Sequence, residues 1–283
     1  MSTHSKSLPT WAFFCIAVNG LLVVLLAWGV QRKYQGSVPP ISRSAAATSV
    51  SAAKPNQITE LGPRHLLNYQ QWVALLEKEA DVVAAQKPEH LAILAGDSIS
   101  LWFPNELLPP TQNWLNQGIS GETSAGLLNR LELFDRTQPN VIFVMIGIND
   151  LIRGVNDETI LANQQMIVRY LRQVHPQTQI VVQSILPHGA DKATWEGRDR
   201  LLSIPNSRIQ DINKQIQAIA KEEGVIYLDL HPLFADAKGN LKPELSTDGL
   251  HLNSQGYTVW RNALIVLNQL VVEPTASREG SRE

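Results

Sequence analysis

Apolar residues follow two alternating patterns along most of the chain. Four continuous apolar or β-branched runs of strand length occupy residues 91–95, 141–146, 179–185 and 225–230, and residues 113–117 form a weaker fifth candidate. Runs without regular polar positions are typical of strands that are buried on both faces. We therefore expect five strands.

Between these runs, apolar residues recur every three or four positions, which predicts amphipathic helices. The sets are Leu127, Leu128, Leu131 and Phe134; Ile160, Ile167, Leu171 and Val174; Ile209, Ile212, Ile216 and Ile219; and Tyr257, Trp260, Leu264 and Leu267. Strands and helices in alternation imply a parallel sheet covered by helices on both faces. The predicted fold class is α/β.

The N-terminal part of the chain has a different pattern. Residues 11–30 are twenty consecutive positions without a charge, and only Asn19 among them is strongly polar. A helix of that length spans roughly 30 Å, which matches a bilayer core. A buried helix of a globular domain is the alternative, and a cleaved signal peptide is disfavoured because Gln31 and Arg32 follow where small residues are expected. We expect one uncleaved transmembrane helix within an anchor of residues 1–35.

The remaining boundaries follow from composition. Residues 36–60 are rich in Ser, Ala and Pro and predict a flexible linker, residues 61–272 carry the folded domain, and residues 273–283 are a polar tail expected to be disordered. The charges that flank the apolar segment do not decide its orientation. Because an anchor and a tether usually serve to keep a domain close to the cell envelope, we expect a single-pass membrane protein with its domain on the extracytoplasmic, periplasmic side.

Composition excludes several classes of protein. The chain has 283 residues, of which 44% are hydrophobic and 18% charged, so it can bury a sizeable core and is not a disordered protein. Its net charge is −2 and it has no long run of Lys or Arg, so nucleic acid is not an expected partner. The single cysteine, Cys15, excludes intramolecular disulfides and thiolate metal clusters.

Polar residues with catalytic potential follow the predicted strands. In a parallel sheet the carboxyl ends of the strands meet at one edge, where ligands bind. Three segments follow strands and one precedes the last helix: Gly96-Asp97-Ser98, Gly118-Ile119-Ser120-Gly121-Glu122-Thr123, Gly147-Ile148-Asn149-Asp150 and Asp248-Gly249-Leu250-His251. Together they supply a hydroxyl, an imidazole, a carboxylate and amide donors, which is the set that acyl transfer requires.

A proton acceptor for a serine nucleophile is available in the last segment. His251 lies three residues after Asp248, a spacing at which a carboxylate can hold the imidazole in the tautomer that accepts the proton of Ser98. Two structural alternatives remain open, namely that Ser98 only caps a helix and that the Asp248–His251 segment is an ordinary surface loop. His231, two residues after Asp229, is a rival pair that we interpret as structural.

Attack on a carbonyl places negative charge on its oxygen, and fixed donors near that oxygen are usually the largest catalytic contribution. Candidate donors are the backbone N–H groups of Ser98 and Gly118 and the amide of Asn149. A glycine in a turn and an asparagine after a strand are also common for structural reasons. Only their occurrence together makes an oxyanion hole the favoured interpretation.

In order and spacing, these four segments resemble the blocks of the SGNH, or GDSL-type, hydrolase family over residues 91–270. The segments 116–123 and Leu186-Pro187-His188-Gly189 are most similar to its platelet-activating-factor acetylhydrolase-like branch. The resemblance implies a flavodoxin-like three-layer α/β/α sandwich with a parallel five-stranded sheet, and a serine esterase without metal or cofactor. It also implies site roles: Ser98 nucleophile, His251 general base and acid, Asp248 its orienting partner, and Ser98, Gly118 and Asn149 the oxyanion hole.

The sequence leaves the substrate open. A short-chain or O-acetyl ester of a small molecule or glycan is favoured. The alternative is a lysophospholipase, which acts on a lipid acyl ester, or a thioesterase. Residues 101–112, with Trp102 and Phe103, and residues 187–208, with Trp195 and Arg198, are long enough to line a cleft, although their aromatic rings could equally serve loop packing. A non-catalytic, membrane-tethered module that binds glycan or lipid is the competing class, and a cytosolic acyl-transfer enzyme is disfavoured.

Overall fold

The computed structural model describes residues 67–269. The predicted anchor 1–35, linker 36–60 and tail 273–283 lie outside the described residues, so these boundaries stay predictions. Between residues 67 and 269, none of the helices combines the length and the apolar character that crossing a bilayer would need. The predicted transmembrane helix falls in the part that is not described.

A five-stranded parallel sheet forms the centre of the fold, as predicted. The strands are β1 (Leu91–Gly96), β2 (Asn113–Gly118), β3 (Val141–Met145), β4 (Gln179–Gln183) and β5 (Ile226–Leu228). Their order is β2-β1-β3-β4-β5, and every neighbouring pair is parallel. This order is the one found in flavodoxin-like doubly wound sheets.

Burial follows strand position. Every residue of β1 and β3 is buried, which explains their continuous apolar sequences. The edge strands β2 and β5 are partly exposed, and β2 accordingly carries polar residues such as Asn113 and Asn116. This is why β2 gave the weakest strand signal.

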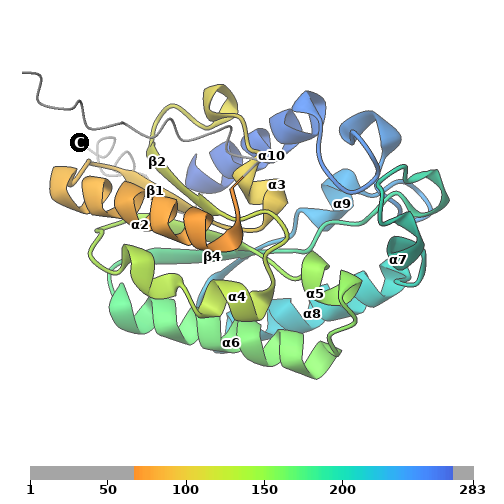
Figure 1. Ribbon diagram of the computed structural model, residues 1–283, viewed down its shortest axis with the longest axis horizontal. Coiled ribbons are helices and arrows are strands. Elements are labelled where there is room, and N and C mark those ends of the chain that lie inside the picture. Colours follow the sequence, from red (N-terminus) through yellow and green to blue (C-terminus); the bar gives the residue numbers. More distant parts are fainter. Residues whose placement is uncertain (1–66, 270–283) are drawn as a thin grey trace, which may run out of the picture. The chain divides into compact units, whose positions relative to one another are not determined.

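Helices cover both faces of the sheet (Figure 1). The α-helices are α2 (Tyr69–Gln86), α3 (Ser98–Leu101), α4 (Ser124–Leu128), α5 (Ile148–Ile152), α6 (Asp157–Val174), α7 (Arg198–Leu202), α8 (Asn206–Glu222), α9 (His231–Phe234) and α10 (Ser254–Leu267). In Figure 1, α6 and α8 run side by side below the sheet, whereas α10 lies above it. Helix α10 buries Trp260, whose Nε1–H donates to Gln183 Oε1 of β4 at 2.7 Å.

Two helical features differ from the predictions. The segment expected as one helix around residues 127–134 is split into α4 and a 3₁₀ helix, η3 (Leu131–Phe134), because Arg130 leaves the helical conformation with φ −127°. Helix α2 was not predicted, although its apolar residues Trp72, Leu76 and Ala80 are spaced four apart and Asn68 caps it. It packs through Trp72 and Leu76 against Ile119 in a small second core.

The topology places two predicted site residues at the end of the sheet where ligands usually bind. In an open α/β sheet, ligands bind beyond the carboxyl ends of the strands at the point where the strand order reverses. That point lies between β1 and β3. Ser98 follows β1 and Asn149 follows β3, so both stand at this end of the sheet.

Candidate active site

Ser98 is the first residue of the short helix α3. Asp97 caps that helix, because its Oδ1 accepts the N–H of Ile99 at 2.9 Å. The alternative that Ser98 is itself the N-cap is therefore wrong. Ser98 is only 5% exposed, and its own N–H has no acceptor within residues 67–269.

The structure brings Ser98, His251 and Asp248 together. The Ser98 hydroxyl lies 3.2 Å from Nε2 of His251, and Nδ1 of His251 lies 2.7 Å from Oδ2 of Asp248. Because the carboxylate accepts the Nδ1 proton, Nε2 is left as the acceptor for the serine hydroxyl. Ser98 is 5% exposed and His251 is 7% exposed, so the contact between these two side chains is largely shielded from water.

The loop that carries Asp248 and His251 is held by its own hydrogen bonds. Oδ1 of Asp248 accepts the N–H groups of Leu250 and His251 at 2.9 and 2.8 Å, which leaves Oδ2 for the ring. Ser246 Oγ donates to the His251 carbonyl at 2.7 Å. Although burial opposes ionisation, the hydrogen bonds from the His251 ring and from these N–H groups lower the pKa of Asp248 below its ordinary value. Asp248 is therefore ionised at neutral pH.

Asn149 carries an unused hydrogen-bond donor. Its Nδ2 is buried and has no acceptor in the described part of the chain. A buried donor without a partner costs free energy, and each such group in a folded protein needs an explanation. This amide is free to bind an oxygen of a ligand.

Gly118 does not present a free donor. Its N–H donates to Oδ1 of Asn116 at 2.9 Å, and Asn116 in turn donates to the Ser100 carbonyl at 2.7 Å. A Cβ at Gly118 would lie 2.5 Å from the backbone N of Leu101 in α3, so glycine is needed here for close packing. The role of Gly118 in an oxyanion hole stays a prediction that would require Asn116 to turn away.

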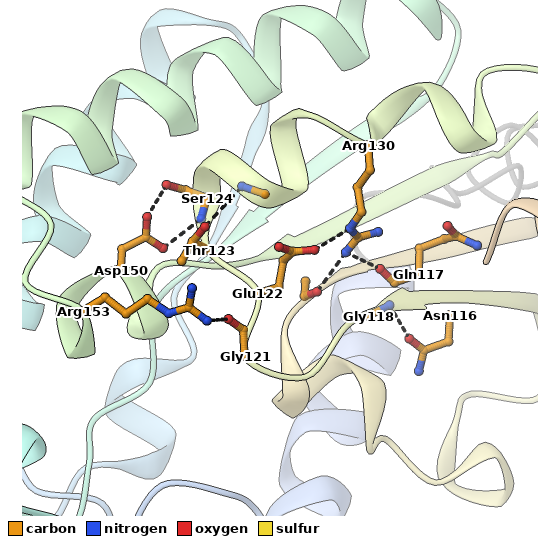
Figure 2. A network of polar contacts seen from close by, with 12 residues as sticks. Asn116, Gln117, Gly118, Gly121, Glu122, Thr123, Ser124, Arg130, Asp150 and Arg153 are labelled. Atoms are coloured by element: carbon orange, nitrogen blue, oxygen red, sulfur yellow. Dashed lines mark hydrogen bonds and ion pairs between the residues drawn. The ribbon is translucent and has the colours of Figure 1, made fainter. Parts of the chain in front are cut away.

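Gly121, in the same loop, was missed by the sequence reasoning. It has φ +74°, a conformation that glycine adopts without strain, and its N–H has no acceptor within residues 67–269. Its carbonyl accepts a hydrogen bond from Arg153 Nη2 at 2.6 Å, which links it to the helix that carries Asn149 (Figure 2). The Ser-Gly-Glu-Thr sequence after the strand was the only available signal.

A buried carboxylate makes a second link between these two segments. Asp150 follows Asn149, and its two carboxylate oxygens accept the N–H and hydroxyl of Ser124 at 2.8 and 2.5 Å (Figure 2). The Ser124 hydroxyl also accepts from Asn163 of α6 at 2.9 Å. Burial raises the pKa of Asp150, although the hydrogen bonds from Ser124 act in the opposite direction.

The rival pair Asp229 and His231 does not assemble in the same way. The contact between them is a hydrogen bond from the His231 backbone N–H to Asp229 Oδ1 at 3.2 Å, and Nε2 of His231 is buried without a partner in the described region. Burial lowers the pKa of His231. The structural interpretation of this histidine is consistent with these contacts.

The two predicted cleft segments divide into packing and exposed residues. Phe103 is buried against Tyr257 and Trp260, so it belongs to the core. Trp102 is 44% exposed and packs against the His251 ring. Trp195 has Arg200 over its ring, 5.6 Å from the centroid.

Residues 187–208 are anchored to the loop that carries Asp248 and His251. The N–H groups of Thr194 and Trp195 both donate to the Asp248 carbonyl, at 2.8 and 2.9 Å. His188 forms a hydrogen bond within this segment, because its Nδ1 accepts the Ala190 N–H at 3.1 Å. The segment therefore supports the position of Asp248.

Among residues 67–269, no group of three or more His, Cys, Asp or Glu side chains is arranged to hold a metal ion. The expectation of a reaction without metal or cofactor stays a prediction.

A parallel α/β fold with a serine, a histidine and a carboxylate in hydrogen-bond sequence defines the class of serine hydrolase-like proteins. The family model described as GDSL-like Lipase/Acylhydrolase matches residues 95–259, more than half of the chain, and the chain belongs to that family. The predicted family is thereby confirmed.

The chain is similar to individual proteins whose descriptions mention platelet-activating factor. The platelet-activating factor acetylhydrolase IB subunit alpha2 of Gallus gallus is 26% identical over 174 residues, which is 58% of this chain and 70% of that protein. A solved structure described as a candidate platelet activating factor from Streptococcus pneumonia is 27% identical, with a TM-score of 0.59 over 70% of this chain and 94% of that one.

A third relative is longer than this chain. The N-acylneuraminate cytidylyltransferase of Streptococcus agalactiae serotype III (strain NEM316) is 25% identical over 182 residues, which is 64% of this chain. The chain spans 41% of the length of that protein.

Proposed function

We propose that this chain is a serine ester hydrolase in which Ser98, His251 and Asp248 form the catalytic triad. The observation that carries the proposal is a pair of hydrogen bonds that share the His251 ring. One joins Ser98 Oγ and His251 Nε2 at 3.2 Å, and the other joins His251 Nδ1 and Asp248 Oδ2 at 2.7 Å. Membership of the acylhydrolase family supports the same chemistry.

In the first half of the reaction, the Ser98 hydroxyl gives its proton to His251 Nε2 as its oxygen attacks the ester carbonyl carbon. The carbonyl oxygen becomes negative and is bound by fixed donors. Unpartnered donors within residues 67–269 support the Ser98 N–H, the Asn149 side chain and the Gly121 N–H for this role. Collapse of the tetrahedral intermediate transfers the His251 proton to the leaving alcohol and leaves an acyl-Ser98.

In the second half, water takes the place of the alcohol. His251 Nε2 removes a proton from the water, whose oxygen attacks the acyl carbon, and the second intermediate releases the carboxylic acid as the proton returns to Ser98. Asp248 keeps the imidazole oriented and stabilises its positive charge in both halves. These steps require no metal or cofactor.

We propose short-chain or O-acetyl esters as substrates. Support comes from the burial of the site, because Ser98 is 5% exposed and His251 is 7% exposed. This burial leaves little open surface for a long acyl chain. A lysophospholipase or thioesterase is the second candidate. Hydrolysis of p-nitrophenyl esters from acetate to decanoate separates them, because a closed acyl site loses kcat/KM beyond propionate whereas a lipase-type site gains it.

We also propose that the domain is tethered to a membrane on its extracytoplasmic side. The proposal rests on the uncharged residues 11–30 and on the Ser-, Ala- and Pro-rich segment that follows them. An alkaline phosphatase fusion at the C-terminus tests it. Phosphatase activity in intact cells is expected, and an inactive fusion would place the domain on the cytoplasmic side.

The catalytic role of Ser98 is tested with Ser98→Ala in the full chain. We expect turnover of p-nitrophenyl acetate to fall by about 10⁴ to 10⁶ and labelling by a fluorophosphonate to disappear. Ser203→Ala is the matched control, because Ser203 is exposed and its hydroxyl donates to the carbonyl of the nearby Arg200 at 2.7 Å. Unchanged turnover in Ser98→Ala would end the proposal, and a wild-type chain that is not labelled would favour a non-catalytic binding module.

A further inference from the structure

A buried ion pair lies beneath the loop that carries Gly121. The Nε–H of Arg130 donates to Oε2 of Glu122 at 2.6 Å, and each side chain is only 3% exposed (Figure 2). Glu122 directly follows Gly121, and Arg130 stands at the break between α4 and η3. No step of the proposed reaction uses either charge.

The guanidinium also binds the ends of two strands. Its Nη2 donates to the carbonyl of Gln117 at 2.9 Å and to the carbonyl of Gly96 at 3.3 Å (Figure 2). Gly96 ends β1 two residues before Ser98, and Gln117 lies in β2 just before the loop. One side chain therefore connects the strand that positions the nucleophile with both sides of the loop around Gly121.

Stability alone is a weak reason for this arrangement. Burying two charges is costly, and replacing a buried ion pair by apolar residues of similar volume is often neutral or stabilising. Here Nη1 of Arg130 is also buried without an acceptor in the described residues. What the ion pair supplies, and apolar packing would not, is a set of directed hydrogen bonds that fix three backbone segments.

We propose that Arg130 and Glu122 are positioning residues. Their ion pair sets the distance between the Gly121 N–H and Ser98, so that this N–H can bind the negative oxygen that forms during turnover. This inference rests on the proposed function. In the described residues neither Arg130 nor Glu122 hydrogen-bonds to a side chain of the Ser98–His251–Asp248 triad, so removing the pair takes away none of the triad's own hydrogen bonds.

The expected effect is on kcat. A displacement of about 1 Å at a reacting centre can cost roughly 100-fold in rate, and losing one oxyanion donor costs about 10²- to 10³-fold. Removing the pair should displace the donor without abolishing it, so we expect kcat to fall about 10- to 100-fold. KM should change less than about threefold, because the ground-state carbonyl binds these donors weakly.

The test uses the full chain with the double substitution Arg130→Met/Glu122→Leu, which replaces the charged pair by apolar groups of similar size. The matched control is Arg136→Met/Asp81→Leu, which removes an exposed Arg–Asp pair. Active sites are counted by complete labelling with a fluorophosphonate, and kcat for p-nitrophenyl acetate is divided by that count. This division separates a loss of folded enzyme from a loss of rate in folded enzyme.

We expect the double variant to label fully but more slowly, with a 10- to 100-fold lower kcat per labelled site. The control should keep wild-type kcat. A kcat per labelled site within twofold of wild type, or an equal loss in the control, would overturn the inference.

A second variant covers the case in which the double variant does not fold. Arg130→Lys keeps the charge beside Glu122, but an ammonium lacks the planar fork that bonds the carboxylate and two carbonyls together. At least a fivefold loss of kcat per labelled site is expected, and wild-type turnover would contradict the inference. Ser98→Ala distinguishes this outcome from failure of the proposed function. Turnover that survives in Ser98→Ala contradicts the triad itself, whereas turnover that is lost in Ser98→Ala but stays at the wild-type level in the Arg130 variants contradicts only the positioning role.

Discussion

The indole of Trp102 lies against the imidazole of His251, with ring centroids 4.3 Å apart and planes tilted by 40°. Trp102 is one helical turn after Ser98, and its N–H donates to the Ser98 carbonyl at 3.0 Å. In the proposed reaction His251 gives its proton to the leaving alcohol, so a group that covers the imidazole lies beside that alcohol. Because Trp102 is 44% exposed, part of its surface is open to a ligand.

This position predicts that Trp102 contributes to binding of the alcohol part of the ester. Trp102→Ala should lower kcat/KM for p-nitrophenyl acetate about tenfold, mainly through KM, and should affect ethyl acetate much less, because a small alcohol gains little from an aromatic surface. Trp102→Phe should retain most of the wild-type preference. An equal loss on both esters would instead mean that Trp102 only holds His251 in place.

Asn149 offers a prediction in which activity and stability separate. Asn149→Ala should reduce kcat about 10²- to 10³-fold, as expected for one oxyanion donor. The free energy of unfolding should not fall, because the substitution removes a buried Nδ2 that has no acceptor in the described part of the structure. Denaturant titration alongside kinetics measures both effects. A large loss of stability with little loss of kcat would contradict the oxyanion role.

Much of this site could be predicted because it follows from the topology. Ser98 and His251 are 153 positions apart, yet one follows the buried strand β1 and the other precedes the last helix at the same edge of the sheet. Continuous apolar sequences identified the central strands directly, since strands buried on both faces have no polar alternation. The spacing of three between Asp248 and His251 was enough to expect their contact.

Other features depend on backbone conformation that the sequence pattern does not reveal. Gly118 and Gly121 look alike in sequence, but of these two only Gly121 has a positive φ and a free N–H. The Gly118 N–H donates to Asn116, and Gly118 packs closely against α3. Arg130 reads as an ordinary polar residue of an amphipathic helix. The sequence does not show that Arg130 is buried, because its burial depends on the interruption of the helix at this residue and on the ion pair with Glu122.

The packing around Gly118 leads to a further prediction. A Cβ there would lie 2.5 Å from the Leu101 N and 2.9 Å from the Asp97 carbonyl oxygen, both of which are backbone atoms that cannot turn aside. Gly118→Ala should therefore displace α3 and destabilise the domain by about 1–3 kcal/mol or more. Chemical denaturation gives the free energy of unfolding, and fluorophosphonate labelling gives the fraction of competent sites. A variant as stable as wild type would show that the loop yields more easily than this geometry implies.

Asp97 leads to a prediction about pH and stability. It is almost completely buried beside Ser98, and burial raises the pKa of its carboxyl group to about 7, against the N–H of Ile99 which lowers it. The ordinary value is 3.8, so between roughly pH 4 and pH 7 the folded chain keeps a proton that the unfolded chain has lost. Stability contributed by this group is therefore present at low pH and lost as the pH rises through that window.

The measurement is the difference in free energy of unfolding between wild type and Asp97→Asn, obtained by urea denaturation from pH 4 to pH 8. Asparagine keeps an oxygen for the Ile99 N–H but does not titrate. Wild type should lose stability relative to the variant by up to about 4 kcal/mol between pH 4 and pH 7, with no further change above pH 8. Other carboxyl groups titrate in both proteins and cancel in the difference. A difference that is constant, or that grows in favour of wild type as the pH rises, would show that Asp97 is charged in the folded protein.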